Sequence, residues 1–200
     1  MIRSLPPPDL ASRHPLLVDV DCVWYRVHSV TRDPIYFGRN SAYRWDAPSG
    51  EYGVLYLAKD PFCAFMESIG RGALYSRFIS KDELTMRALS CLNTARPLRL
   101  VDLVESGGLT RIGAESSLTS ALDKLEKYSV SQQWSKALRE HPSKPDGILY
   151  RSRHDPSREA CAIYDHCAAI VAVQEAFGAW SDNVRLLGEI LNHYDFGTDL

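Results

Sequence analysis

The stretch that most constrains the fold is the apolar run VLYLA at residues 54–58. Gly53 stands before it and the pair Asp60-Pro61 soon after it, so the run fits a short buried strand better than a helix. Asp60 suits a helix N-cap and Pro61 suits the first helical position, so a helix should begin directly after the strand. Glu67 then falls about mid-helix, beside the apolar face.

Turn residues and hydrophobic periodicity divide the rest of the chain into short elements. We predict strands within 22–29, 83–106 (two, joined by a turn), 145–154 and 159–176 (one or two), a loop over 31–53, and helices at 114–141 and 182–194. The helix at 114–141 should be interrupted near 128–131, with Ser129 or Ser131 as the cap of its second part. Strands interspersed with helices, without strict alternation, predict an α+β fold rather than a doubly wound sheet.

A length of 200 residues suits a single domain with its own core. Residues 1–18 are rich in proline and should form an irregular arm, because proline lacks the backbone donor that a strand ladder needs. The domain proper is predicted over 19–180. Residues 181–200 should form a C-terminal amphipathic helix packed on it.

Composition excludes several partners and cofactors. A net charge of −2 gives no basic surface for direct nucleic-acid binding, and no apolar run reaches the ~18 residues of a membrane span. The N-terminus lacks the apolar region of a secretory signal, so a cytoplasmic location is expected. Five cysteines without a C-x-x-C pair predict buried thiols rather than disulfides. The set Cys161, His166 and Cys167 with His154 matches no standard zinc spacing, so no metal is expected.

Common enzyme motifs are missing from the sequence. It holds no phosphate-binding G-x-x-x-x-G-K-S/T, no G-x-G-x-x-G, no G-x-S-x-G and no H-E-x-x-H. What remains is a dispersed polar set on apolar elements: Arg26, Arg44, Tyr56, Glu67, Ser152 and His154. Each alone is more often an ordinary core or surface residue. Together, a carboxylate, two arginines and a tyrosine suit a pyridine dinucleotide, since arginine forks bind a diphosphate and an aromatic face stacks on a cationic ring.

Three separated blocks resemble the RES domain in order and spacing: the arginine-rich loop with YRW, EYGVLYLA followed by AFME, and DGILYRSRHD. The likeness runs from about Trp24 to Tyr164. The arginine, glutamate and serine for which that family is named would be Arg44, Glu67 and Ser152. Arg39 is the other candidate for the motif arginine.

The resemblance implies a fold similar to ADP-ribosyltransferases, with central mixed or antiparallel β-sheets flanked by helices. It also implies the toxin of a type II toxin–antitoxin pair that depletes NAD⁺ as its substrate, with an Xre-type helix-turn-helix antitoxin as partner. Glu67 would stabilise the oxocarbenium character that develops at the ribose, and Ser152 would hydrogen-bond the ribose or a phosphate. The residues expected to bind substrate are Arg26, Arg39, Tyr43, Tyr56 and His154.

Alternatives stay open at this point. The acceptor could be water, phosphate or a protein, and the last case would make the chain an ADP-ribosyltransferase with a protein target. A non-catalytic binding module with the same fold is a further reading. The oligomeric state is open, a homo-oligomer included. In the serine block, Arg151 stands where members of the family often have proline.

Overall fold

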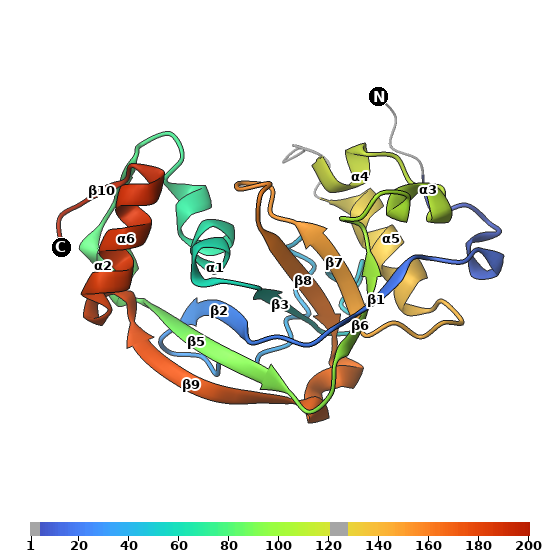
Figure 1. The fold of residues 1–200 in the computed structure, drawn as a ribbon, viewed down its shortest axis with the longest axis horizontal. Helices are drawn as coiled ribbons and strands as arrows, with labels where there is room; N and C mark the ends of the chain where they lie inside the picture. Colours follow the sequence, from blue (N-terminus) through green and yellow to red (C-terminus); the bar gives the residue numbers. More distant parts are fainter. Residues whose placement is uncertain (1–4, 121–127) are drawn as a thin grey trace.

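A computed structural model of the chain describes residues 5–120 and 128–200. Its centre is a strongly curled sheet of eight strands in the order β1-β6-β7-β8-β3-β2-β5-β9 (Figure 1). Neighbouring strands are antiparallel except β6 and β7, which run parallel. The strands are β1 (Leu17–Val20), β2 (Trp24–Ser29), β3 (Val54–Ala58), β5 (Arg87–Thr94), β6 (Leu98–Asp102), β7 (Gly147–Arg151), β8 (Glu159–Tyr164) and β9 (Val171–Ala179). The predicted α+β class is confirmed.

Helices and a second, small sheet surround this framework. The helices are α1 (Pro61–Ser68), α2 (Lys81–Thr85), α3 (Gly108–Ile112), α4 (Ser117–Ser120), α5 (Ser129–Arg139) and α6 (Val184–Tyr194), and β4 (Phe78–Ile79) pairs with β10 (Gly197–Thr198). Short 3-10 turns lie at Leu10–Ser12, Gly70–Gly72, Asp165–Ile170 and Trp180–Asp182. In the part of the chain that the structure describes, no helix combines the length and apolar character needed to cross a bilayer.

The strand predicted at 54–58 and the helix predicted directly after it both form. β3 covers Val54–Ala58 and lies between β8 and β2 in the sheet. The Asp60 side chain accepts a hydrogen bond from the Cys63 amide at 2.9 Å and caps α1. Pro61 is the first residue of the helix. Because strand and cap are fixed to each other, the start of α1 has a defined position over the sheet.

The core has three parts that follow the faces of the sheet. Leu55 and Leu57 of β3 pack on one face with the cluster around Trp24, and Val54 and Ala58 pack on the other. The third part joins α1 to the C-terminal helix α6, whose Leu187, Ile190 and Leu191 pack against Phe65 and Met66. All five cysteines are free thiols, and Cys63, Cys91, Cys161 and Cys167 are buried.

Three local predictions differ from the structure. Residues 81–85 form α2 instead of the start of a strand, because the Ser80 hydroxyl caps the turn by accepting from the Glu83 amide. The capping role predicted for Ser129 or Ser131 is wrong: α5 starts after Tyr128 in the left-handed conformation, with φ 58°, and no side chain caps it. The interruption predicted near 128–131 includes Tyr128, a turn residue directly before α5, whereas residues 121–127 lie outside the described part of the chain. The last residues of the arm enter β1, which pairs with β6 from Leu17 onwards.

Candidate active site

Glu67 and Ser152, predicted from separate blocks, are hydrogen-bonded to each other. The Ser152 hydroxyl donates to Glu67 Oε1 at 2.7 Å, and the Arg153 amide donates to the same oxygen at 3.0 Å. Glu67 lies near the end of α1 and Ser152 follows β7, so the two meet where the β7–β8 connection rises beside α1 (Figure 1). Eighty-five residues separate them in the sequence. The bond fixes one carboxylate oxygen and leaves Oε2 without a recorded partner among the described residues.

The Ser152 hydroxyl has no capacity left for chemistry of its own. It is 1% exposed, and its oxygen also accepts from the amides of His154 at 3.2 Å and Asp155 at 3.1 Å. A hydroxyl offers one donor and two acceptor sites, and all three are in use. Ser152 is therefore placed to orient Glu67 and to hold the turn, and it is not placed to act as a nucleophile.

A second set of bonds holds the β7–β8 connection against the helices. Arg158 donates to Asp60, the cap of α1, at 2.8 Å and to Asp155 at 2.9 Å. The Tyr194 hydroxyl of α6 donates to Asp155 at 2.6 Å. Burial alone would raise the pKa of Asp155, but hydrogen bonds from Ser157, Tyr194 and Arg158 outweigh it and lower that pKa. The turn that carries Ser152 is thus tied to both α1 and α6.

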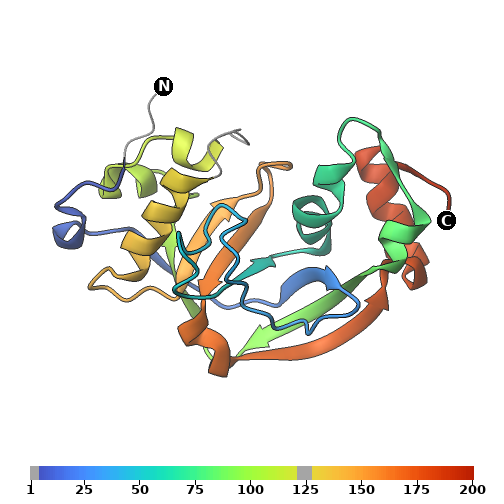
Figure 2. The ribbon, with the colours of Figure 1, turned by 180° about the vertical axis from the view of Figure 1, so that it is seen from behind.

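Tyr56 of β3 anchors the long loop 31–53. Its hydroxyl accepts from the Trp45 amide at 2.9 Å and donates to Asp46 at 3.0 Å. Asp46 is 1% exposed, and burial raises its pKa despite hydrogen bonds from the Tyr43 amide and from Tyr56. The loop lies over the sheet beside α5 (Figure 2), where Ser135 donates to the Trp45 carbonyl at 2.6 Å. The Tyr56 hydroxyl therefore has a structural task, while its ring meets Tyr43 edge-on at 5.8 Å between centroids.

The predicted arginines occupy different places. Arg44 donates to the Thr119 carbonyl at 2.7 Å, and its charge reaches both His154 and Tyr150. Arg39 instead pairs with Asp165 at 2.6 Å, next to the Gly53 amide at the start of β3. Since Glu67 lies beyond the other end of β3, the structure does not bring Arg39 to it. This placement favours Arg44 as the motif arginine, an assignment that stays a prediction.

Arg26 is connected to the site only indirectly. Its guanidinium donates to the Pro34 carbonyl, and burial lowers its pKa to about 10, while Asp33 and Tyr43 act in the opposite direction. No hydrogen bond from Arg26 to Glu67 or Ser152 occurs within the described ranges. Of the groups whose charge acts most strongly on the pKa of Arg26, Tyr43 is the one that belongs to the predicted site residues.

His154 lies among several cations. Burial lowers the pKa of its imidazole, and Arg153, Arg71 and Arg44 lower it further, whereas Glu67 raises it. The lowered pKa favours the neutral imidazole at pH 7. It can donate or accept a hydrogen bond there, but it adds no positive charge to the site.

Sequence reasoning missed four residues around this centre. Asp46 holds Tyr56, and Tyr150 is 4% exposed within electrostatic range of Glu67 and Arg44. Asp46 follows the YRW motif directly, which was an available signal. Arg153 acts through its backbone amide, which carries no sequence signal. Arg71 follows the end of α1, among glycines that indicate only a helix terminus.

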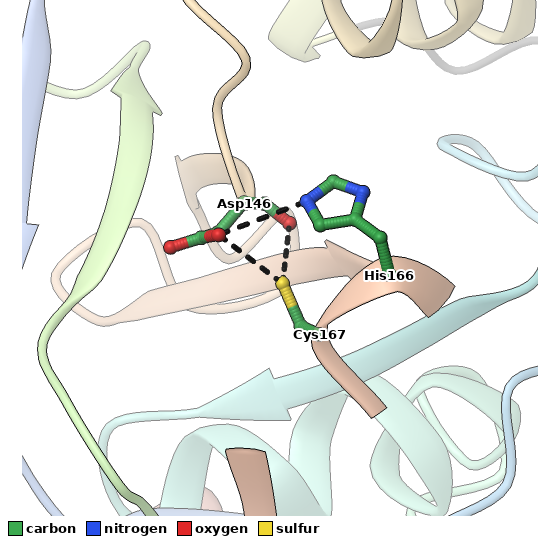
Figure 3. A group of neighbouring side chains, drawn as sticks. All are labelled: Asp146, His166 and Cys167. Carbon is green, nitrogen blue, oxygen red and sulfur yellow. Dashed lines mark hydrogen bonds and ion pairs between the residues drawn. The ribbon is translucent and has the colours of Figure 1, made fainter. Parts of the chain in front are cut away.

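A separate polar cluster lies at the start of β7 (Figure 3). Asp146, His166 and Cys167 bring their ligand atoms within 4.8 Å of one another. Cys161 and His154, considered with them in the sequence, do not belong to this group. The Asp146 carboxylate is already bound by both terminal nitrogens of Arg96 and by the Arg99 amide at 2.8 Å. Burial opposes ionisation, but the Arg96 pair and the other donors hold the pKa of Asp146 well below its usual range. This saturated carboxylate acts as an internal brace.

Comparison with known proteins gives the family. The family model of the RES domain matches residues 23–186, which is most of the chain. The chain belongs to the RES-domain family. The Glu67–Ser152 pair and Arg44 all lie inside the matched RES domain, and the curled sheet with flanking helices is consistent with an ADP-ribosyltransferase-like RES fold.

One solved structure is similar to this RES domain across most of its length. It is described as the crystal structure of the M. tuberculosis MbcT–MbcA toxin–antitoxin complex. The matched chain shares 14% sequence identity and a TM-score of 0.64, with 88% of this chain and 92% of that chain covered. At this identity the likeness concerns the fold. The search of curated protein sequences gave no match.

Proposed function

We propose that this RES-domain protein is the toxin of a toxin–antitoxin pair and that it depletes NAD⁺ by breaking the nicotinamide–ribose bond. The observation that carries the proposal is the Glu67 carboxylate, oriented by Ser152 and the Arg153 amide beside Tyr150, His154 and Arg44. One oriented anion among aromatic and cationic side chains suits a substrate that combines a diphosphate with a cationic ring.

The reaction would proceed by loss of nicotinamide. The bond between the ribose C1′ and the ring nitrogen breaks, and its electron pair goes to that nitrogen, so nicotinamide leaves as a neutral molecule. The ribose gains oxocarbenium character, which the nearby Glu67 carboxylate stabilises. Attack by water gives ADP-ribose and a proton, whereas attack by phosphate gives ADP-ribose 1″-phosphate. No covalent intermediate is required, in keeping with the fully used Ser152 hydroxyl.

Arg44 and Arg26 would bind the diphosphate, and Tyr43 and Tyr56 would pack against the nicotinamide. This division follows the residue types and the aromatic contact of 5.8 Å between the two tyrosines. Arg39 is left out of the proposed substrate contacts because Asp165 holds it at the far end of β3.

The experiment is a product assay on the purified protein. NAD⁺ is incubated with and without phosphate, and free nicotinamide and the ADP-ribosyl product are quantified. Nicotinamide release with soluble ADP-ribose or its 1″-phosphate supports the proposal and identifies the acceptor. Label from adenine-labelled NAD⁺ appearing on a protein would support ADP-ribosyl transfer instead. No release under either condition would leave the non-catalytic binding module as the better reading.

The partner is tested in cells. We propose an antitoxin of the Xre helix-turn-helix type, encoded beside the toxin. The fold similarity to the toxin–antitoxin complex and the RES family support a partner of this role. Induction of the chain should stop growth and lower cellular NAD⁺, and co-expression of the neighbouring gene should restore both. Growth arrest without a fall in NAD⁺ would contradict the proposed activity.

A further inference from the structure

Arg71 is an exposed cation at the edge of the candidate site. It lies four residues after Glu67, in the 3-10 turn Gly70–Gly72 that continues α1. Its guanidinium carbon lies over the ring of Tyr43, 5.3 Å from the centroid. The described part of the chain gives Arg71 no carboxylate partner, although Glu67 stands at the i−4 spacing that often forms an ion pair on a helix.

The ring that supports Arg71 is itself held in place. Tyr43 meets Tyr56 edge-on at 5.8 Å, and the Tyr43 amide donates to the buried Asp46 at 2.9 Å. A guanidinium that rests on an aromatic face keeps its N–H groups available, because the ring attracts the cation without using any of them. Within the described ranges, the Arg71 guanidinium contacts the Tyr43 ring and has no ion-pair partner.

Arginines outnumber carboxylates among the strongest electrostatic influences on His154. The charges of Arg71, Arg44 and Arg153 lower the pKa of His154, and Glu67 raises it. Arg71 and Gly72 are both exposed, and a Cβ added at Gly72 would meet no atom within 4 Å. Clustered arginines beside open space are suited to a bound anion, and phosphate oxygens match the guanidinium fork best.

We propose that Arg71, supported by Tyr43, is a phosphate-binding residue of this site and takes the diphosphate of the dinucleotide. The inference rests on the proposed function for the identity of the substrate. A different role would be purely structural, with Arg71 joining the end of α1 to the loop 31–53. The two roles make different predictions. Only with phosphate binding should the effect of removing Arg71 on KM depend on how many phosphates the substrate carries.

The test compares substrates that carry two, one or no phosphates. NAD⁺, nicotinamide mononucleotide and nicotinamide riboside are each assayed with the wild-type protein and with Arg71→Ala. We expect KM for NAD⁺ to rise roughly tenfold, the usual effect of losing a charged hydrogen bond. The rise should be smaller for the mononucleotide and absent for the riboside. Arg71→Lys keeps the charge but loses the planar guanidinium, so its KM for NAD⁺ should lie between those of the wild type and Arg71→Ala. An equal rise of KM for all three substrates would assign Arg71 the structural role and overturn the proposal.

Arg32→Ala is the matched control. Arg32 is exposed and stacks on Tyr36 at 5.4 Å, in the loop that also carries Tyr43, and no contact of Arg32 with Glu67, Ser152 or His154 occurs among the described residues. Removing it should leave all three KM values unchanged. If KM rose as much in Arg32→Ala as in Arg71→Ala, the effect would not be specific to Arg71, and this would also contradict the proposal.

A binding measurement separates this inference from the proposed reaction. ADP-ribose, which carries the diphosphate but no nicotinamide, is titrated into wild-type protein and Arg71→Ala by calorimetry. Binding that weakens about tenfold in the variant supports the phosphate site even if NAD⁺ is not cleaved. If the wild type cleaves NAD⁺ but Arg71→Ala binds ADP-ribose with unchanged affinity, the phosphate-binding role of Arg71 is wrong, whereas the proposed reaction is supported. No ADP-ribose binding to the wild type would also overturn the phosphate site.

Discussion

The Glu67 carboxylate gains its position from a single serine hydroxyl and one backbone amide. Both donate to the same oxygen, so the carboxylate is oriented before substrate arrives. Preorganisation of this kind stabilises a developing charge more than the ground state, because no reorientation is needed during the reaction. The orientation of Glu67 should therefore control the rate of the chemical step more than it controls binding.

Ser152→Ala tests this at the scale of one residue. Loss of the hydroxyl removes one of two donors to Glu67 and the acceptor of two turn amides. We expect kcat for NAD⁺ cleavage to fall roughly 10- to 100-fold, with KM little changed. Ser68→Ala is the control, since Ser68 neighbours Glu67 on α1 and its hydroxyl binds only carbonyls of that helix. An unchanged kcat in Ser152→Ala would contradict the role of Ser152.

Tyr56 and Asp46 connect two elements, the strand β3 and the loop 31–53. A buried carboxylate that loses a donor carries a cost in stability, because its desolvation is no longer compensated. We expect Tyr56→Phe to lower the free energy of unfolding by about 1–3 kcal/mol. Urea denaturation measures the change, and Tyr36→Phe, on an exposed tyrosine of the same loop, should cost nothing measurable. Equal stability of Tyr56→Phe and wild type would refute the anchoring role.

The start of α1 is the second element-scale feature. Asp60 caps the helix through the Cys63 amide and also receives Arg158 from the β7–β8 connection. Asp60→Asn keeps an acceptor for the cap but loses the charge, whereas Asp60→Ala loses both. We expect Asp60→Ala to cost at least the ~1 kcal/mol of a helix cap and to lower kcat as well, because the turn that carries Ser152 loosens. Asp60→Asn should be milder in both measurements. If both variants were as stable as the wild type, the contacts of Asp60 with the Cys63 amide and with Arg158 would not contribute to stability.

The sequence predicted the elements around the site better than their contacts. β3 and α1 came out at the predicted places because a short apolar run, an N-cap and a proline are local signals. The pairing of Glu67 with Ser152 was expected only from the family resemblance, since no local rule joins residues 85 positions apart. The paired state of Arg39 depends on Asp165, 126 residues away, and Arg71 and the Arg153 amide gave no signal at all. Long-range geometry of this kind is fixed by the sheet order.

At the scale of the whole molecule, carboxylates that accept several hydrogen bonds make stability depend on pH. The pKa values of Asp146, Asp155 and Asp165 are all lower in the folded chain than in the unfolded one. The folded state therefore binds fewer protons, and the stabilisation is fully present above the unfolded value near 4. It is lost as the pH falls below that value.

Asp146 should contribute most clearly to this loss, since Arg96 binds both of its oxygens. We expect Asp146→Asn to be less stable than wild type at pH 7 and the difference to shrink as the pH falls towards 3. Denaturant unfolding at a series of pH values measures it. A difference independent of pH would show that the lost contribution is not electrostatic.

We propose that Glu67 is the residue on which NAD⁺ cleavage by this RES domain depends. The most direct test is nicotinamide release by purified wild-type protein and by Glu67→Gln, which keeps the size of the side chain and removes its charge. We expect release by the wild type and a rate at least ~10²-fold lower in a folded Glu67→Gln protein. Equal rates from the two proteins would contradict it.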